Sequence, residues 1–185
     1  MSGESQQDGN VARRLTEMAA RAPDATAVVE PLGYAPGGRR YRKVTFRELD
    51  QDSDRIAAGI GELGAKPGTR LALLVRPGID FVALAFGLLK SGAVSILIDP
   101  GMGRKNLIRC LAEAEPEGFV AIPMVHAVRT FVKSRFPKAK LNVTVGPRWF
   151  WGGPTLTHFR NQPWPGTTIA PTTWNDPAAI IFTTG

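Results

Sequence analysis

Residue types that build covalent cross-links and metal sites are scarce in this sequence. Its 185 residues include one cysteine, Cys110, and two histidines, His126 and His158. A single cysteine cannot close an internal disulfide, and no second ligand lies at metal-binding spacing. Neither histidine has a carboxylate partner nearby in the sequence. We therefore expect no metal site, a buried Cys110, and structural or surface roles for both histidines.

A long hydrophobic run is also absent. The longest apolar stretch, residues 81–89, has nine residues, whereas about 20 are needed to span a bilayer. Residues 1–10 are polar and lack the apolar core of a secretory signal. These features predict no transmembrane segment, and with the low cysteine content they favour a location in the reducing cytoplasm.

Acidic residues are almost missing from the second part of the chain. The net charge is +7, and residues 118–185 hold seven basic residues but one acidic residue, Asp176. Five of the basic residues lie in the segment 129–140, and such a cluster suits nucleic acid or an anionic membrane. Because no nucleic-acid motif accompanies it, we interpret the cluster as a solvated helix face, or as a surface that meets acidic residues of a longer chain. No nucleic-acid partner is expected, and a non-catalytic basic binding module remains an alternative function.

What the sequence does contain is a regular alternation of short β runs and helical periods. This order predicts an α/β fold with a mostly parallel, doubly wound sheet and crossover helices. Strands are expected at residues 70–75, 93–98, 119–122 and 141–145, with helices between them at 78–90, 106–115 and 124–136. A last buried strand is expected at residues 178–182.

A helix and a hairpin are predicted near the start of the chain. The helix spans residues 10–21, and Val11, Leu15 and Met18 recur on one apolar face. Two short strands, 25–29 and 41–44, are expected to pair around a Gly/Pro-rich loop at residues 34–40.

A second helix carries the clearest local signal. Thr45 is followed three residues later by Glu48, which is the spacing of a capping box. Apolar or small residues then recur on one face, and Gly64 stands where a left-handed residue ends a helix. These residues are Phe46, Leu49, Ser53, Ile56, Ile60 and Leu63.

The two least periodic segments are residues 1–9 and 147–174. The first is expected to be disordered. The second contains all four tryptophans and is predicted to be an ordered loop with short pieces of structure. Within it, Trp149, Phe150 and Trp151 are expected to pack over the sheet, although aromatic side chains also suit contact with a long acyl chain or a membrane.

Two hydroxyls and a glycine follow the last predicted strand, as Thr183, Thr184 and Gly185. Ligands of α/β folds bind beyond the carboxyl ends of the strands. Hydroxyls and backbone N–H groups donate to phosphate oxygens, and glycine lets the backbone approach closely. Taken alone, the tripeptide is a weak signal and is more typical of an ordinary strand-ending turn, and no Gly-Lys-Ser/Thr of a Walker loop is present.

The stretch 176–185 resembles the lead-in to the Ser/Thr/Gly-rich phosphate loop of the adenylate-forming (AMP-binding, acyl-CoA-synthetase-like) superfamily. Segments 44–50, 64–75 and 81–100 resemble, in the same order, the superfamily's early helix start, a strand entry and a core helix–strand pair. More narrowly, residues 99–106 and 117–128 resemble the β-lactone synthetases of bacterial long-chain olefin biosynthesis. Residues 76–80 depart from the common superfamily pattern, at a place where no catalytic residue is expected.

The resemblance implies that residues 1–185 are the N-terminal portion of a large AMP-binding domain, incomplete by themselves. The phosphate loop is then expected to continue past Gly185, where the catalytic residues would also lie. Thr183, Thr184 and Gly185 would contact the phosphates of ATP, with Mg²⁺ as the accompanying ion. The expected partners are the remainder of the same chain and other enzymes of olefin biosynthesis.

The implied reaction activates a long-chain 2-alkyl-3-hydroxy acid as its acyl-adenylate. The 3-hydroxyl then attacks the activated carbonyl, giving a β-lactone and AMP. In a long-chain fatty-acyl-CoA ligase coenzyme A attacks instead, and an acyl-AMP ligase is a related possibility. The residues present do not distinguish between these nucleophiles.

Overall fold

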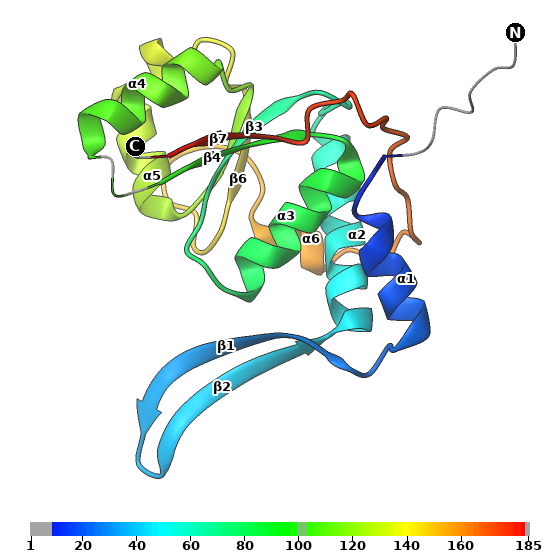
Figure 1. The fold of residues 1–185 in the computed structure, drawn as a ribbon. Coiled ribbons are helices and arrows are strands. Elements are labelled where there is room, and N and C mark those ends of the chain that lie inside the picture. Colours follow the sequence, from blue (N-terminus) through cyan, green and yellow to red (C-terminus); the bar gives the residue numbers. More distant parts are fainter. Residues whose placement is uncertain (1–8, 100, 102, 184–185) are drawn as a thin grey trace, which may run out of the picture.

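The computed structural model describes residues 9–183 except 100 and 102. Five parallel strands form the central sheet, and an antiparallel hairpin extends away from it (Figure 1). The predicted disorder of residues 1–9 falls, apart from Gly9, outside the described residues. No helix of the described part has the length and apolar character that a membrane span needs.

The strands of the sheet follow the order β6-β5-β3-β4-β7, and every neighbouring pair is parallel. This confirms the predicted doubly wound α/β fold. The strands are β3 (Arg70–Leu74), β4 (Val94–Ile98), β5 (Gly118–Ala121), β6 (Leu141–Thr144) and β7 (Ala179–Phe182). The connecting helices are α3 (Ile79–Ser91), α4 (Arg104–Ala114) and α5 (Pro123–Phe131), the last followed by a short 3-10 turn, η2 (Lys133–Arg135).

One face of the sheet is covered by α3 and by α2 (Phe46–Glu62), as Figure 1 shows. The predicted capping box is confirmed, because the N–H of Glu48 donates to Thr45 Oγ1 at 3.3 Å and the N–H of Thr45 donates to Glu48 Oε2 at 2.8 Å. The helix ends before Gly64, whose φ of 93° is left-handed. A Cβ on Gly87 of α3 would collide with Ile56 of α2, so the glycine permits the close packing of these helices.

A buried ionic cluster joins the helices of this face. Lys90 of α3 donates to Asp50 Oδ1 at 2.6 Å and to Asp54 Oδ1 at 2.5 Å, both on α2. Asp54 Oδ2 also accepts hydrogen bonds from Trp164 Nε1 at 2.9 Å and Thr167 Oγ1 at 3.1 Å. The cluster therefore holds the segment after residue 160 against the helices.

The opposite face of the sheet is covered by α4 and α5 (Figure 1). Its core is smaller and contains Leu111 and Ala114 of α4, Phe119 of β5 and Phe136, which follows η2. The rings of Phe119 and Phe136 meet edge to face at 5.1 Å. The sheet thus separates two cores, one on each side.

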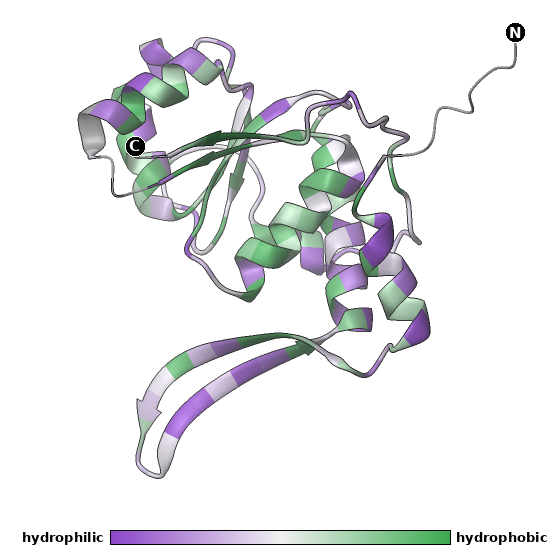
Figure 2. Cartoon of the chain, in the orientation of Figure 1, coloured by the Kyte–Doolittle hydropathy of each residue, from purple (hydrophilic) through white to green (hydrophobic). Residues whose placement is uncertain are grey.

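The hairpin differs from its prediction. Its strands, β1 (Thr26–Ala35) and β2 (Gly38–Thr45), run through most of the predicted loop 34–40, and the turn is confined to Pro36 and Gly37. Gly37 and Gly38 have φ values of 106° and 122°, which allow so tight a reversal. Figure 2 shows that β2 is largely hydrophilic, in contrast to the strands of the central sheet.

The first helix starts later than predicted, as α1 (Arg13–Arg21). Asn10 is bound to other parts of the chain, because its Nδ2 donates to Leu89 O at 2.8 Å and Ala170 O at 3.0 Å. Val11 therefore precedes the helix and is exposed, so its predicted place on the apolar face is wrong, whereas Leu15 is buried as expected.

Segment 147–174 contains one short helix, α6 (Leu156–Arg160), as expected for an ordered loop with short pieces of structure. Arg160 of α6 is paired with Asp52 of α2 at 2.7 Å and with Asp80 of α3 at 2.9 Å. Among the three consecutive aromatic residues, only Trp151 is buried. The predicted packing of Trp149 and Phe150 over the sheet is wrong, because both are exposed.

Strand β7 is less buried than predicted. It lies at the end of the strand order, so it pairs only with β4 among the described strands. Ile180 and Phe182 pack against the core below α4 and α5, while Ala179 and Ile181 point the other way and are exposed. No described helix covers that side of β7.

Candidate functional site

The carboxyl ends of β3, β4 and β7 meet at one edge of the sheet, because the three strands are parallel neighbours. The chain leaves β3 toward α3 on one face and leaves β4 toward α4 on the other. Connections that depart to opposite faces leave a crevice at the strand ends, which is where α/β folds bind ligands. We call this edge the switch edge.

The ends of β4 and β7 are held side by side at the switch edge. Ile98 is paired with Phe182, and the N–H of Asp99 donates to Phe182 O at 3.2 Å. The Asp99 carboxylate binds the residues that follow it, because its Oδ1 accepts from the N–H of Gly101 at 2.8 Å. Thr183 follows directly after Phe182 and is exposed.

Several groups at the switch edge can donate hydrogen bonds to an anion. Thr183 offers a hydroxyl, and the exposed Arg76 follows β3 by two residues. Helix α4 begins after Gly103, whose φ is 79° and which has no side chain that could cap the first turn. N–H groups at a helix start favour negative charge. The described groups of this edge therefore suit the phosphates of a nucleotide.

Of the three residues predicted to contact phosphate, the structure describes Thr183 only. Thr184 and Gly185 lie outside the described residues. Sequence reasoning assigned no role to Asp99, which the pairing of Ile98 with Phe182 places next to Thr183. The available signal was an Asp-Pro pair directly after a buried strand, but its neighbour could be named only once the pairing of β4 with β7 was known.

The cysteine and the two histidines, for which the sequence predicts no metal-binding or catalytic role, lie away from this edge. Cys110 is buried on α4. His126 of α5 is fully buried, its Nε2–H donates to Val143 O at 3.0 Å, and its ring stacks on Trp151 at 5.5 Å. Burial lowers the pKa of His126, against the opposing effect of the hydrogen bond to Val143. His158 is exposed on α6.

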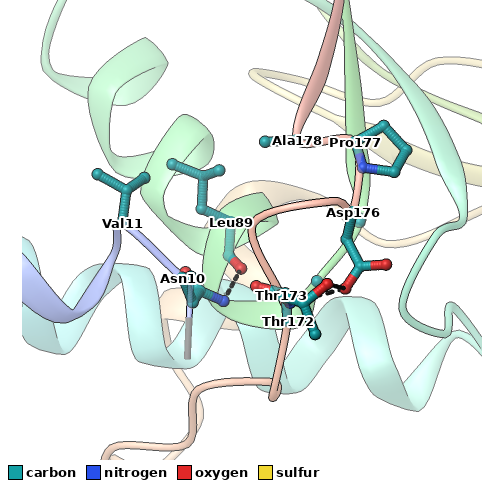
Figure 3. A pocket seen from close by; sticks show the side chains of 11 residues that line it. Asn10, Val11, Leu89, Thr172, Thr173, Asp176, Pro177 and Ala178 are labelled. Atoms are coloured by element: carbon teal, nitrogen blue, oxygen red, sulfur yellow. Dashed lines mark hydrogen bonds between the residues drawn. The ribbon is translucent and has the colours of Figure 1, made fainter. Parts of the chain in front are cut away.

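A small cavity of about 50 Å³ lies at the opposite edge of the sheet, at the amino ends of β4 and β7. Figure 3 shows Asn10 pointing across it to the carbonyl of Leu89, and Asp176 turned back to Thr173. The polar groups of this cavity bind one another, and its volume is close to that of one or two water molecules. We interpret it as a structural junction.

Metal chemistry has no candidate ligand set in the described part of the chain. No group of three or more His, Cys, Asp or Glu side chains is placed there to hold a metal ion. The described residues thus contain no preformed ligand set for a metal ion, and we assign no step of a reaction to Mg²⁺.

A doubly wound sheet with polar donors at its switch edge is typical of the α/β proteins that bind ligands beyond the carboxyl ends of their strands. The chain matches the family of AMP-binding enzymes over residues 15–185, and it belongs to that family. This membership confirms the resemblance inferred from residues 176–185 and from the three earlier segments.

Two curated relatives match almost the whole chain. An olefin β-lactone synthetase from Stenotrophomonas maltophilia is 42% identical over 180 residues, and one from Xanthomonas campestris pv. campestris is 40% identical over 179 residues. Each match covers 95% of this chain and 32% of the relative. The chain thus spans about a third of the length of these proteins.

Solved structures of the same fold include a long-chain-fatty-acid-CoA ligase from Archaeoglobus fulgidus. It superposes with a TM-score of 0.80 at 19% identity, over 95% of this chain and 34% of that one. At this level of identity the likeness concerns the fold alone.

Proposed function

We propose that this chain belongs to an enzyme that activates a long-chain 2-alkyl-3-hydroxy acid with ATP and converts it to a β-lactone. The carrying observation is the 40–42% identity to two olefin β-lactone synthetases over 95% of the chain. The exposed hydroxyl of Thr183 at the switch edge is the local feature that fits it. Residues 1–185 are then part of the large AMP-binding domain.

In the first proposed step, a carboxylate oxygen of the acid attacks the α-phosphorus of ATP. The bond from the α-phosphorus to the bridging oxygen breaks, and pyrophosphate leaves. Thr183 donates a hydrogen bond to the terminal phosphates, together with Thr184 and Gly185. Such donors favour the reaction where they stabilise the charge that develops on the leaving group.

In the second proposed step, the 3-hydroxyl oxygen of the same molecule attacks the acyl carbonyl carbon. The bond from that carbon to the AMP oxygen breaks, AMP leaves, and the hydroxyl proton is lost to solvent or to a base. Because nucleophile and carbonyl belong to one molecule, no second substrate has to be ordered. A coenzyme A thiol would give a thioester at the same stage, which is the competing outcome.

Product analysis of the full-length protein tests this proposal. With a long-chain 2-alkyl-3-hydroxy acid, ATP and Mg²⁺, we expect AMP, pyrophosphate and a β-lactone without added coenzyme A. The same acid without its 3-hydroxyl is the matched control, and it should give no lactone. AMP release that requires coenzyme A, with a thioester product, would replace the proposal by a ligase activity. Absence of AMP and pyrophosphate with both acids would reject adenylation itself.

A further inference from the structure

We propose that the exposed side of α5 and η2 docks onto an anionic lipid bilayer. This α5 surface consists of the apolar side chains Met124, Val128 and Phe131 of α5 and the basic side chains Lys133 and Arg135 of η2, and Lys140 follows η2 in the chain. The proposal goes beyond the reaction above and does not depend on which nucleophile completes it.

The apolar part of the α5 surface is a stripe along one side of the helix. Met124, Val128 and Phe131 are spaced by four and three residues, which places them on the same face. Their exposed fractions are 69%, 53% and 85%. The opposite side of α5 is turned into the protein, where His126 is fully buried. One side of α5 is therefore apolar but does not pack in the core of the protein.

The stripe borders an open apolar groove of about 310 Å³ between α4 and α5. Met124 and Val128 form one wall of the groove, and Leu107 and Leu111 of α4 form the other. Exposed apolar area beside an apolar groove marks an interaction surface more often than chance exposure.

The charge around the stripe is positive and lacks compensation. No carboxylate of the described residues lies within salt-bridge distance of Lys133, Arg135 or Lys140. Glu115 is paired with Lys138 at 2.9 Å and Glu113 with Arg109 at 3.9 Å, and Glu117 Oε1 accepts from the N–H of Arg70 at 3.0 Å. The occupant of this surface must therefore be both apolar and anionic.

A bilayer with anionic headgroups meets both requirements at once. Interfacial helices insert an apolar side among the acyl chains, while their Lys and Arg side chains remain at the level of the headgroups. Basic side chains near an anionic membrane and the burial of a Phe side chain among acyl chains both favour binding. Nucleic acid would satisfy the charge but leave the stripe of Met124, Val128 and Phe131 in water.

The test is co-sedimentation of the full-length protein, without ATP, with vesicles. Vesicles of phosphatidylcholine alone are compared with vesicles that also contain phosphatidylglycerol. We expect binding to the anionic vesicles only, weakening as salt is raised. The double variants Lys133→Glu/Arg135→Glu and Met124→Ser/Phe131→Ser should each lower the partition coefficient at least about tenfold.

The hairpin supplies matched controls, because it is also basic and carries exposed aromatic residues. Arg39→Glu/Arg40→Glu repeats the charge change, and Tyr34→Ser removes an exposed aromatic side chain, 79% accessible, away from α5. Neither should change vesicle binding by more than about twofold. Equal losses in control and α5 variants would overturn the proposal.

Two further outcomes would also overturn it. If the wild-type protein ignores anionic vesicles and Met124→Ser/Phe131→Ser lowers its thermal stability, a later segment of the chain covers α5. If binding follows charge alone and nucleic acid competes with it, the surface is a polyanion site. AMP formation from a water-soluble acid, measured on the same variants, reports separately on the proposed reaction and should be unchanged.

Discussion

The two faces of the sheet are covered by the same kind of element but differ in how they are closed. On the side of α2 and α3, a buried Lys90 joins two carboxylates, and the segment 161–170 is bound over the helices. On the side of α4 and α5, a groove stays open and apolar side chains face outward. The first face is therefore closed by polar and ionic contacts within the chain, whereas the second leaves exposed the surface for which we propose membrane docking.

The largest loss of stability is expected when the buried cation between α2 and α3 is removed. In Lys90→Ala, Asp50 and Asp54 stay buried without their shared partner. Loss of one member of a buried ion pair costs about 3–5 kcal/mol. Urea unfolding of the full-length protein measures this loss, with the exposed Lys66→Ala as control. A loss below about 1 kcal/mol would mean that the cluster does not close this face.

Truncating one leucine on each face of the sheet compares how tightly the two faces are packed. Leu84 of α3 is fully buried, and Leu111 of α4 is buried but lines the open groove. Leu84→Ala leaves a closed cavity and should lower the free energy of unfolding by about 3–5 kcal/mol, whereas Leu111→Ala should lower it by about 2 kcal/mol because the site is open on one side. Equal losses, measured by the same unfolding experiment, would argue that the α4 face is as tightly closed as the other.

A smaller effect is expected where α2 begins. Thr45→Ala removes one half of the capping box and should cost about 1 kcal/mol, while Thr45→Ser should keep most of the stability. Thermal unfolding of both variants measures the difference. If the serine and alanine variants were equally stable, the box would contribute nothing to the closed face.

The prediction for the open face concerns pH. Burial lowers the pKa of His126 below its ordinary value of 6.5, so the unfolded chain binds this proton more readily than the folded one. The free energy of unfolding should therefore fall as the pH drops below about 6.5. His126→Gln should flatten this dependence. Unfolding curves about one pH unit above and below that value measure it, and identical slopes in the wild-type protein and the variant would contradict the assignment.

Local signals predicted individual elements well. The capping box fixed the start of α2, because Thr45 and Glu48 interact across three residues of one chain segment. The length of the hairpin strands was underestimated, because Gly37 and Gly38 are typical of a tight turn as well as of a loop. Only the pairing of Tyr34 with Arg39 shows that the strands continue.

The parts that sequence could not supply depend on neighbours far along the chain. The burial of β7 was overestimated, because Ile181 has no described helix over its side of the strand. Trp149 and Phe150 were expected inside, but Trp151 alone fills the space beside His126. At the switch edge, Thr183 was found from its position after a strand, whereas Asp99 needed the order of the strands.

In the proposed reaction, the ends of β4 and β7 form the edge that receives the phosphates of ATP. This phosphate contact can be tested by acid-dependent exchange of pyrophosphate into ATP by the full-length protein. Thr183→Ala should slow the exchange about ten- to a hundredfold without changing the KM for the acid, because it removes a hydrogen bond to a charged group. Thr157→Ala, an equally simple change at an exposed threonine of α6, should leave the rate unchanged. Equal exchange rates in the two variants would contradict the claim.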